Sequence, residues 1–190
     1  MSVVIHEFSH GYAAFLMGDP TAKNAGRLTL NPLAHLDLMG SLIVPLVAYL
    51  SAGFMFGWAK PVPYNPYNLR HQRYGGAMVA LAGPASNLLV ALFFGLMLRL
   101  GFFSGVSVNL VLAIHMIILI NLVLAVFNLI PVPPLDGSKI LFSFLPYRLI
   151  GVRQNLERYS LFILLFIIFF LWKFFFPFIL FLFSIITGLS

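Results

Sequence analysis

The 190-residue sequence contains no cysteine and few charged residues, which make up 8% of the chain and include only five acidic ones. Without cysteine, a disulfide framework and a thiolate-bound metal are both excluded, so any zinc ion must be held by His, Asp or Glu. Charge this sparse, beside 61% hydrophobic residues, is far from a soluble domain. The composition indicates a polytopic membrane protein in a lipid bilayer.

The charges that are present are mostly positive, with a formal net charge of +6. A basic chain can bind nucleic acid, but here the Lys and Arg residues lie between apolar segments, where they report membrane topology. We therefore predict no nucleic-acid partner.

Long apolar stretches divide the chain into a predicted all-α membrane protein. About four of them should form spanning helices: 1–17, 75–98, 106–130 and 159–187. The last is interrupted by Lys173 and Pro177, so it predicts either one tilted helix or a helix followed by a re-entrant tail. We expect a single transmembrane domain over 1–190, with a core over 1–146 and an apolar helical region over 159–187. Seventeen residues barely cross a bilayer core of ~30 Å, which predicts that the chain start is truncated.

The connecting segments predict short irregular elements. Arg27–Leu30 alternates like a short strand, and 57–64, which contains Pro61 and Pro63, should be extended. A short helix is expected over 138–145.

The pattern His6-Glu7-x-x-His10 is the most informative local feature. On a helix, residues four apart lie one turn apart on the same face, so His6 and His10 can occupy two positions of a tetrahedral zinc site. Glu7 is placed to reach a metal-bound water without binding the metal itself. Three fixed residues also recur by chance, but polar groups on a helix this apolar are costly and tend to be kept for function.

Asp136 is the candidate third ligand, because it is a lone carboxylate in an apolar stretch with irregular backbone. Such backbone survives at membrane depth only against protein or a water-filled cavity. The alternative is structural: Asp136 could be the N-cap of the helix expected to start near Ser138.

Together these motifs resemble the site-2 protease family of intramembrane metalloproteases. The resemblance rests on His6-Glu7-x-x-His10 and on Asn128-x-x-Pro131-x-Pro133-x-x-Asp136-Gly137. Two further stretches are similar to signatures of the compact bacterial branch of this family: Gly83-Pro84-x-x-Asn87 and Gly57-Trp58-Ala59-Lys60-Pro61-Val62-Pro63.

The resemblance implies one zinc ion on His6, His10 and Asp136, with Glu7 as the general base. It implies cleavage of peptide bonds in single-span membrane proteins, with Asn128 contacting substrate or oxyanion. Two rival hypotheses are a non-catalytic metal-binding or transport protein and a pseudo-protease that holds client helices. A metal carrier has no need for Glu7 between its ligands, and no internal repeat of the transporter kind is visible.

Other polar residues in the apolar segments have weaker signals. Asn87 and Asn121 are predicted to hydrogen-bond between helices, with Asn87 a possible support of the metal site. His115 should be packed or hydrogen-bonded between helices rather than bind metal. His35 and His71 are expected at the surface or the membrane interface.

Topology follows from the metal geometry together with charge. His10 and Asp136 must lie near the same membrane face, which requires the apolar segment 39–57 to be re-entrant. Nine of the eleven basic residues then fall at that face, and only Arg99 and Lys173 lie toward the other. Positive charge marks the cytoplasmic side, so the prediction is a multi-pass protein of the bacterial plasma membrane with its active site toward the cytoplasm.

Residues 60–64 are a candidate substrate-binding strand. In a strand, Pro61 and Pro63 would share one edge and have no N–H there, whereas Lys60, Val62 and Tyr64 would donate from the other edge. That donor edge could capture an opened substrate helix by strand addition. Alternatively, the prolines only protect an exposed edge, and the donor edge pairs within the protein.

Overall fold

The computed structural model describes residues 1–52 and 60–188, and within these ranges the chain forms helices and no β-strand. The α-helices are α1 (Ser2–Leu16), α2 (Thr21–Asn24), α3 (Val44–Ala52), α4 (Gly75–Arg99), α5 (Val108–Asn128), α6 (Asp136–Phe144), α7 (Ile150–Arg158), α8 (Ser160–Phe166) and α9 (Trp172–Thr187). Short 3-10 turns lie at Pro32–His35, Pro66–Asn68 and Tyr147–Leu149. Wider π-helical turns lie at Leu38–Ile43 and Ile167–Leu171.

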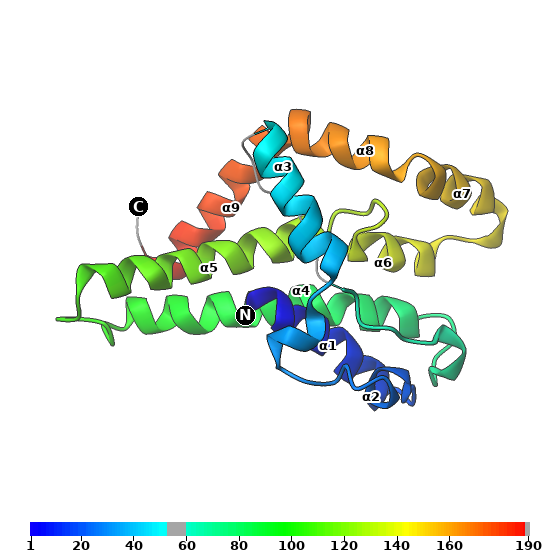
Figure 1. Ribbon diagram of the computed structural model, residues 1–190, viewed down its shortest axis with the longest axis horizontal. Helices are drawn as coiled ribbons and strands as arrows, with labels where there is room; N and C mark the ends of the chain where they lie inside the picture. Colours follow the sequence, from blue (N-terminus) through cyan, green and yellow to red (C-terminus); the bar gives the residue numbers. More distant parts are fainter. Residues whose placement is uncertain (53–59, 189–190) are drawn as a thin grey trace.

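Three helical stretches among the described residues are long and apolar enough to cross a membrane. They are Gly75–Arg99, Val108–Asn128 and Ser160–Thr187, the last combining α8, a π-helical turn and α9. The apolar C-terminal run is therefore one continuous helical stretch, bent at the π-helical turn (Figure 1). With 15 residues, α1 is about 22 Å long, which is short of a ~30 Å bilayer core. Three of the about four expected spans therefore meet this criterion among the described residues, and α1 does not.

The long helices α4 and α5 run antiparallel and side by side, with α1 lying along α4 and the lower part of α9 beside α5 (Figure 1). A buried cluster joins α4, α5 and α9, and it consists of Ala91, Ile114, Ile118, Leu122, Ile179 and Ile186. Many other apolar side chains on these helices face outward, as expected of a surface that lipid covers. This cluster holds α4, α5 and α9 together, and α1, which carries His6 and His10, packs against α4.

Two strands were expected and neither is present in the part of the chain that the structure describes. The Arg27–Leu30 stretch is irregular, because its groups bond to side chains and loops: the carbonyl of Thr29 accepts from His35. Residues 60–64 lie extended but pair with no strand, and the expected extended residues 57–59 lie outside the described ranges. The Lys60 N–H donates to the carbonyl of His35 at 3.0 Å, so the residue where the described chain resumes after α3 lies next to the 3-10 turn that precedes α3.

Asp19 joins the end of α1 to the loop that precedes α4. Its side chain is fully buried and accepts hydrogen bonds from Thr21, from the N–H of Asn65 at 2.6 Å and from Nδ2 of Asn68 at 2.9 Å. Burial pushes the pKa of this carboxyl upward, but the hydrogen bonds outweigh it and hold the pKa below its ordinary value. Asp19 is therefore ionised at neutral pH and ties the two loops together.

Asp19→Asn should lower the stability of the purified protein at neutral pH by about 1–3 kcal/mol, because charged hydrogen bonds to a buried group are lost. A lowered pKa means that the ionised carboxylate stabilises the fold above its unfolded pKa, near pH 4, and that this stabilisation disappears as the pH falls through the folded pKa. Thermal melting in detergent from pH 7 to pH 3 should show the difference between wild type and variant shrinking. Glu157→Gln, which breaks only an exposed ion pair with Arg153, is the control and should change little.

Candidate active site

His6 and His10 lie one turn apart on α1, and both are buried, at 4% and 7% exposure. Each ring is oriented by its Nδ1 atom. His6 Nδ1 is 2.6 Å from Asn87 Oδ1, and His10 Nδ1 is 2.7 Å from the carbonyl oxygen of Val79. Both partners are acceptors, so both Nδ1 atoms carry the proton. The two Nε2 atoms consequently present lone pairs to the same point in space.

The orientation of Asn87 is itself determined by a network that crosses three helices. Its Nδ2 donates to Asn121 Oδ1 at 2.8 Å and to the carbonyl of Ser2 at 3.3 Å, which turns its Oδ1 toward His6. Asn121 donates in turn to the hydroxyl of Ser2 and to the carbonyl of Ile117. The predicted interhelical hydrogen bonds of Asn87 and Asn121 are thus present, and Asn87 supports His6 directly.

Asp136, the first residue of α6, places its carboxylate beside the two imidazoles. Its Oδ2 lies 3.1 Å from His6 Nε2 and 3.0 Å from His10 Nε2, while its Oδ1 accepts from Lys139 Nζ at 3.2 Å. The N-cap alternative is wrong: α6 begins at Asp136, the N-cap is Leu135, and no side chain caps the helix. The next residue has to be glycine, because a Cβ on Gly137 would overlap the carbonyl of Leu129 at the end of α5.

These three ligand atoms form a triangle whose edges are 3.0–3.1 Å, since the two Nε2 atoms are themselves 3.0 Å apart. Ligands bound to zinc at 2.0–2.1 Å with tetrahedral angles would be about 3.3 Å apart, so the donor set fits zinc closely. Two imidazole lone pairs and a carboxylate oxygen repel one another at this distance unless a proton or a metal ion lies between them. Among the described residues, this is the one group of three or more His, Asp or Glu that could hold a metal ion.

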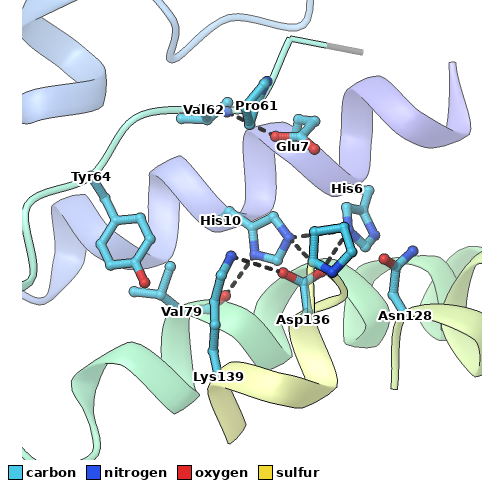
Figure 2. Close-up of a pocket in the computed structure, with 11 residues that line it drawn as sticks. His6, Glu7, His10, Pro61, Val62, Tyr64, Val79, Asn128, Asp136 and Lys139 are labelled. Carbon is cyan, nitrogen blue, oxygen red and sulfur yellow. Dashed lines mark hydrogen bonds and ion pairs between the residues drawn. The ribbon is translucent and has the colours of Figure 1, made fainter. Parts of the chain in front are cut away.

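Glu7 lies beside this triangle on the wall of a cavity of about 140 Å³ (Figure 2). Its Oε2 accepts the N–H of Val62 at 2.9 Å, which leaves the second carboxylate oxygen for other partners. The rest of the lining comes from Pro61, Val62, Tyr64, Val79, Asn128, Pro134 and Lys139, together with the three ligand residues. The cavity has room for water, and it brings a potential base next to a potential metal.

The candidate substrate strand is largely engaged within the protein. The N–H of Lys60 donates to His35 and that of Val62 to Glu7, so two of the three predicted donors already have internal partners. The internal-pairing alternative is therefore present at Lys60 and Val62, while a role of this segment in substrate binding stays a prediction. The N–H partners are a 3-10 turn and a side chain, and the expected Arg27–Leu30 stretch contributes only Arg27, whose Nη2 donates to the carbonyl of Lys60 at 3.4 Å. Tyr64 lines the cavity with its ring 5.8 Å from Lys139 Nζ.

The remaining histidines were predicted with mixed success. His35 is not at the surface: it is 2% exposed, with Nε2 donating to the carbonyl of Thr29 and Nδ1 without a partner among the described residues. The sequence pattern did not reveal that Thr29 lies against this imidazole. His71 is exposed, as expected. His115 packs against the Phe183 ring at 5.7 Å and bonds to Val111, in agreement with a packing role.

Sequence reasoning missed three groups that position the metal ligands: the backbone carbonyl of Val79, the Lys139 ammonium and the bare Cα of Gly83. A carbonyl has no sequence signal, and Lys139 was counted only as a topology marker. Gly83 stood in a recognised motif, but its role is steric. A Cβ there would lie 2.5 Å from His10 Nε2 and 2.6 Å from His6 Nε2.

Gly83→Ala should therefore abolish stoichiometric zinc binding, because the added methyl displaces both imidazoles from the triangle. Zinc content of the purified variant, measured by elemental mass spectrometry, should fall from about one ion per chain to near zero. Gly76→Ala is a matched control on the same helix, where the nearest atom is Tyr64 Oη at 3.9 Å, and it should keep its zinc. Full zinc occupancy in the Gly83 variant would contradict this geometry.

Comparison with known proteins agrees with the site. Residues 105–171 match the family model described as Peptidase family M50. The chain is 41% identical over 164 residues to "Putative zinc metalloprotease YwhC" of Bacillus subtilis, an alignment that covers 83% of this chain and 70% of that protein. It is 32% identical over 137 residues to "Putative zinc metalloprotease Rip2" of Mycolicibacterium smegmatis, covering 72% of this chain and 51% of that protein.

A protein of the same name from Mycobacterium tuberculosis is 30% identical over 137 residues, and the chain again spans about half its length. No solved structure matches the chain. The extent and identity of the Bacillus match, together with the family model, show that the chain belongs to peptidase family M50, the site-2 protease family.

Proposed function

We propose that this protein is an intramembrane zinc endopeptidase that cleaves transmembrane helices of single-span membrane proteins. Its membership of family M50 makes it a zinc metalloprotease, and the finer proposal concerns its site and substrates. The observation that carries the proposal is the convergence of His6, His10 and Asp136 beside Glu7, in a chain with three membrane-spanning stretches.

His6, His10 and Asp136 would hold the zinc ion, each through one atom, with the unused oxygen of Asp136 bonded to Lys139. When bound, zinc supplies a water of lowered pKa and polarises the scissile carbonyl. Glu7 is the proposed general base: it takes a proton from the attacking water and passes it to the leaving amine. Its position next to His6, on the cavity wall and off the ligand triangle, supports that role.

Asn128 is proposed to contact the substrate carbonyl. It lies at the end of α5 and lines the same cavity, with Nδ2 donating to the carbonyl of Leu124 at 3.0 Å. An amide nitrogen has two hydrogens, so the second can be directed at an oxyanion. Figure 2 places Asn128 near His6 and away from Lys139, so these two polar groups would flank the bond being cut.

The membrane placement is also a proposal, with the active site toward the cytoplasm. Elements that carry basic residues, including α2, α6 and α7, lie at one end of α4 and α5, whereas the turn after Arg99 and the end of α9 lie at the other (Figure 1). The His35–Lys60 hydrogen bond supports the re-entrant placement of 39–57, because these two residues lie on either side of that segment in the sequence. The excess of positive charge marks the cytoplasmic side.

Glu7→Gln should abolish cleavage while about one zinc ion per chain is retained, because the variant loses the base and keeps the ligands. Asp136→Ala should lose both zinc and activity. The assay is hydrolysis of a panel of single-span membrane peptides by purified protein, with and without a chelator, beside a zinc determination. Near wild-type cleavage by Glu7→Gln would overturn the assignment of the base, and full zinc in Asp136→Ala would require another ligand.

Membrane topology can be tested by single cysteines, because the chain has none of its own. Cysteines at Asn24, Asn68 and Asn155 should be labelled by an impermeant maleimide from the cytoplasmic side, and a cysteine at Ser104 from the opposite side. The cysteine-free parent is the control for background labelling. If positions 24 and 68 are labelled from opposite sides, the 39–57 segment crosses the membrane and the proposed topology is wrong.

A further inference from the structure

Residues 60–65, here called the strap, cross α1 directly over the proposed base. Val62 donates its N–H to Glu7 Oε2 at 2.9 Å (Figure 2). Its neighbours Pro61 and Pro63 have no N–H, so Val62 is the donor that the centre of the strap can offer. A hydrogen bond from a backbone amide to an ionised carboxylate is stronger than one between neutral groups, and it restricts rotation of the side chain.

The side chain of Val62 is anchored on the same helix as Glu7. It is 7% exposed and packs on the bare Cα of Gly11, one turn after Glu7. A Cβ on Gly11 would lie 2.8 Å from Val62 Cγ1 and 3.2 Å from the Cβ of Ala22, distances at which a neighbour must move. One residue thus contacts α1 twice, through its side chain at Gly11 and through its backbone at Glu7.

Both ends of the strap are also held. At one end the Lys60 N–H donates to the carbonyl of His35, and at the other the Asn65 N–H donates to the buried carboxylate of Asp19. Asp19 lies just beyond the end of α1 at Leu16, so the strap is attached near the end of the helix that carries the base. These contacts leave Val62 little freedom to slide along α1.

We propose that Gly11 and Val62 are positioning residues for the general base, with the seat of Val62 on Gly11 holding the Val62 N–H against Glu7. The inference rests on the proposed function, in which Glu7 moves the proton. With Oε2 bound to the strap, Oε1 is directed to the attacking water, and displacements of about 1 Å in such a group cost rate steeply. The strap then helps to hold the general base in position for catalysis.

Gly11→Ala tests the seat. Its Cβ should push Val62 away from α1, so kcat should fall at least tenfold, a part of the roughly 10²–10⁴-fold that a general base contributes. KM should change less than about threefold and zinc should stay near one ion per chain, because a Cβ at Gly11 would meet Val62, Ala22 and Leu28 and none of the candidate metal ligands. Gly151→Ala is the control: it adds a methyl to an α-helix where nothing lies within 4 Å, and it should leave kcat unchanged.

A double variant separates positioning from general damage. Val62→Ala removes the methyl that the new Cβ would meet, so Gly11→Ala/Val62→Ala should recover at least threefold in kcat over Gly11→Ala alone. A wild-type kcat in Gly11→Ala, or a double variant that is no faster than the single one, would overturn the proposal.

Amide exchange of the strap provides a readout that needs no cleavage. Residues 60–64 have amides only at Lys60, Val62 and Tyr64, so mass spectrometry of this peptide reports strongly on Val62. Exchange should be faster in Gly11→Ala and in Glu7→Ala than in wild type, and unchanged in Gly151→Ala. Equal exchange in wild type and Glu7→Ala would refute the contact. If the wild-type protein cleaves no peptide, the proposed function fails, while the seat of Val62 is still decided by exchange.

Discussion

Three electron-pair donors that point at one another inside an apolar helix bundle are the constraint on which this structure depends. His6, His10 and Asp136 are buried with their candidate ligand atoms about 3 Å apart, an arrangement that is costly unless a shared proton or a metal ion lies between them. The neighbouring polar groups orient these three side chains. Asn87 and the Val79 carbonyl hold the protons of the two rings away from the centre, and Lys139 occupies the second carboxylate oxygen.

Two glycines allow the helices to pack closely around this polar centre. Gly83 lets α4 approach the two imidazoles, and Gly137 lets α6 start against the end of α5. Between α1, α4 and α5 the amides of Asn87 and Asn121 satisfy each other and Ser2, so the buried polar groups of the network are paired. A fully satisfied network in a low-dielectric interior stiffens the helices that it joins, which keeps the ligand atoms in register.

The strap is held at its ends by loop residues, Asp19 and His35, and in its centre by α1, where Val62 packs on Gly11. Its contacts run from Asp19 and His35 to Glu7, so the loops on either side of α3 influence a carboxylate at the metal site. The strap also forms one wall of the cavity. If the cavity takes an opened substrate helix as proposed, the same residues shape the substrate site and hold the proposed base.

The amino-acid sequence by itself determined the membrane character, the long helices and the choice of His6 and His10 as candidate metal ligands, because hydrophobic runs and the His6-Glu7-x-x-His10 spacing are local properties. It also determined that Asp136 was a candidate ligand, but local pattern left capping as an alternative. Only the tertiary structure excluded the cap and brought Asp136 beside His6, 130 residues away, while its role as a ligand stays a proposal. The buried state of His35 and the engagement of Val62 by Glu7 were likewise beyond the sequence, because both depend on where loops far apart in the chain come together.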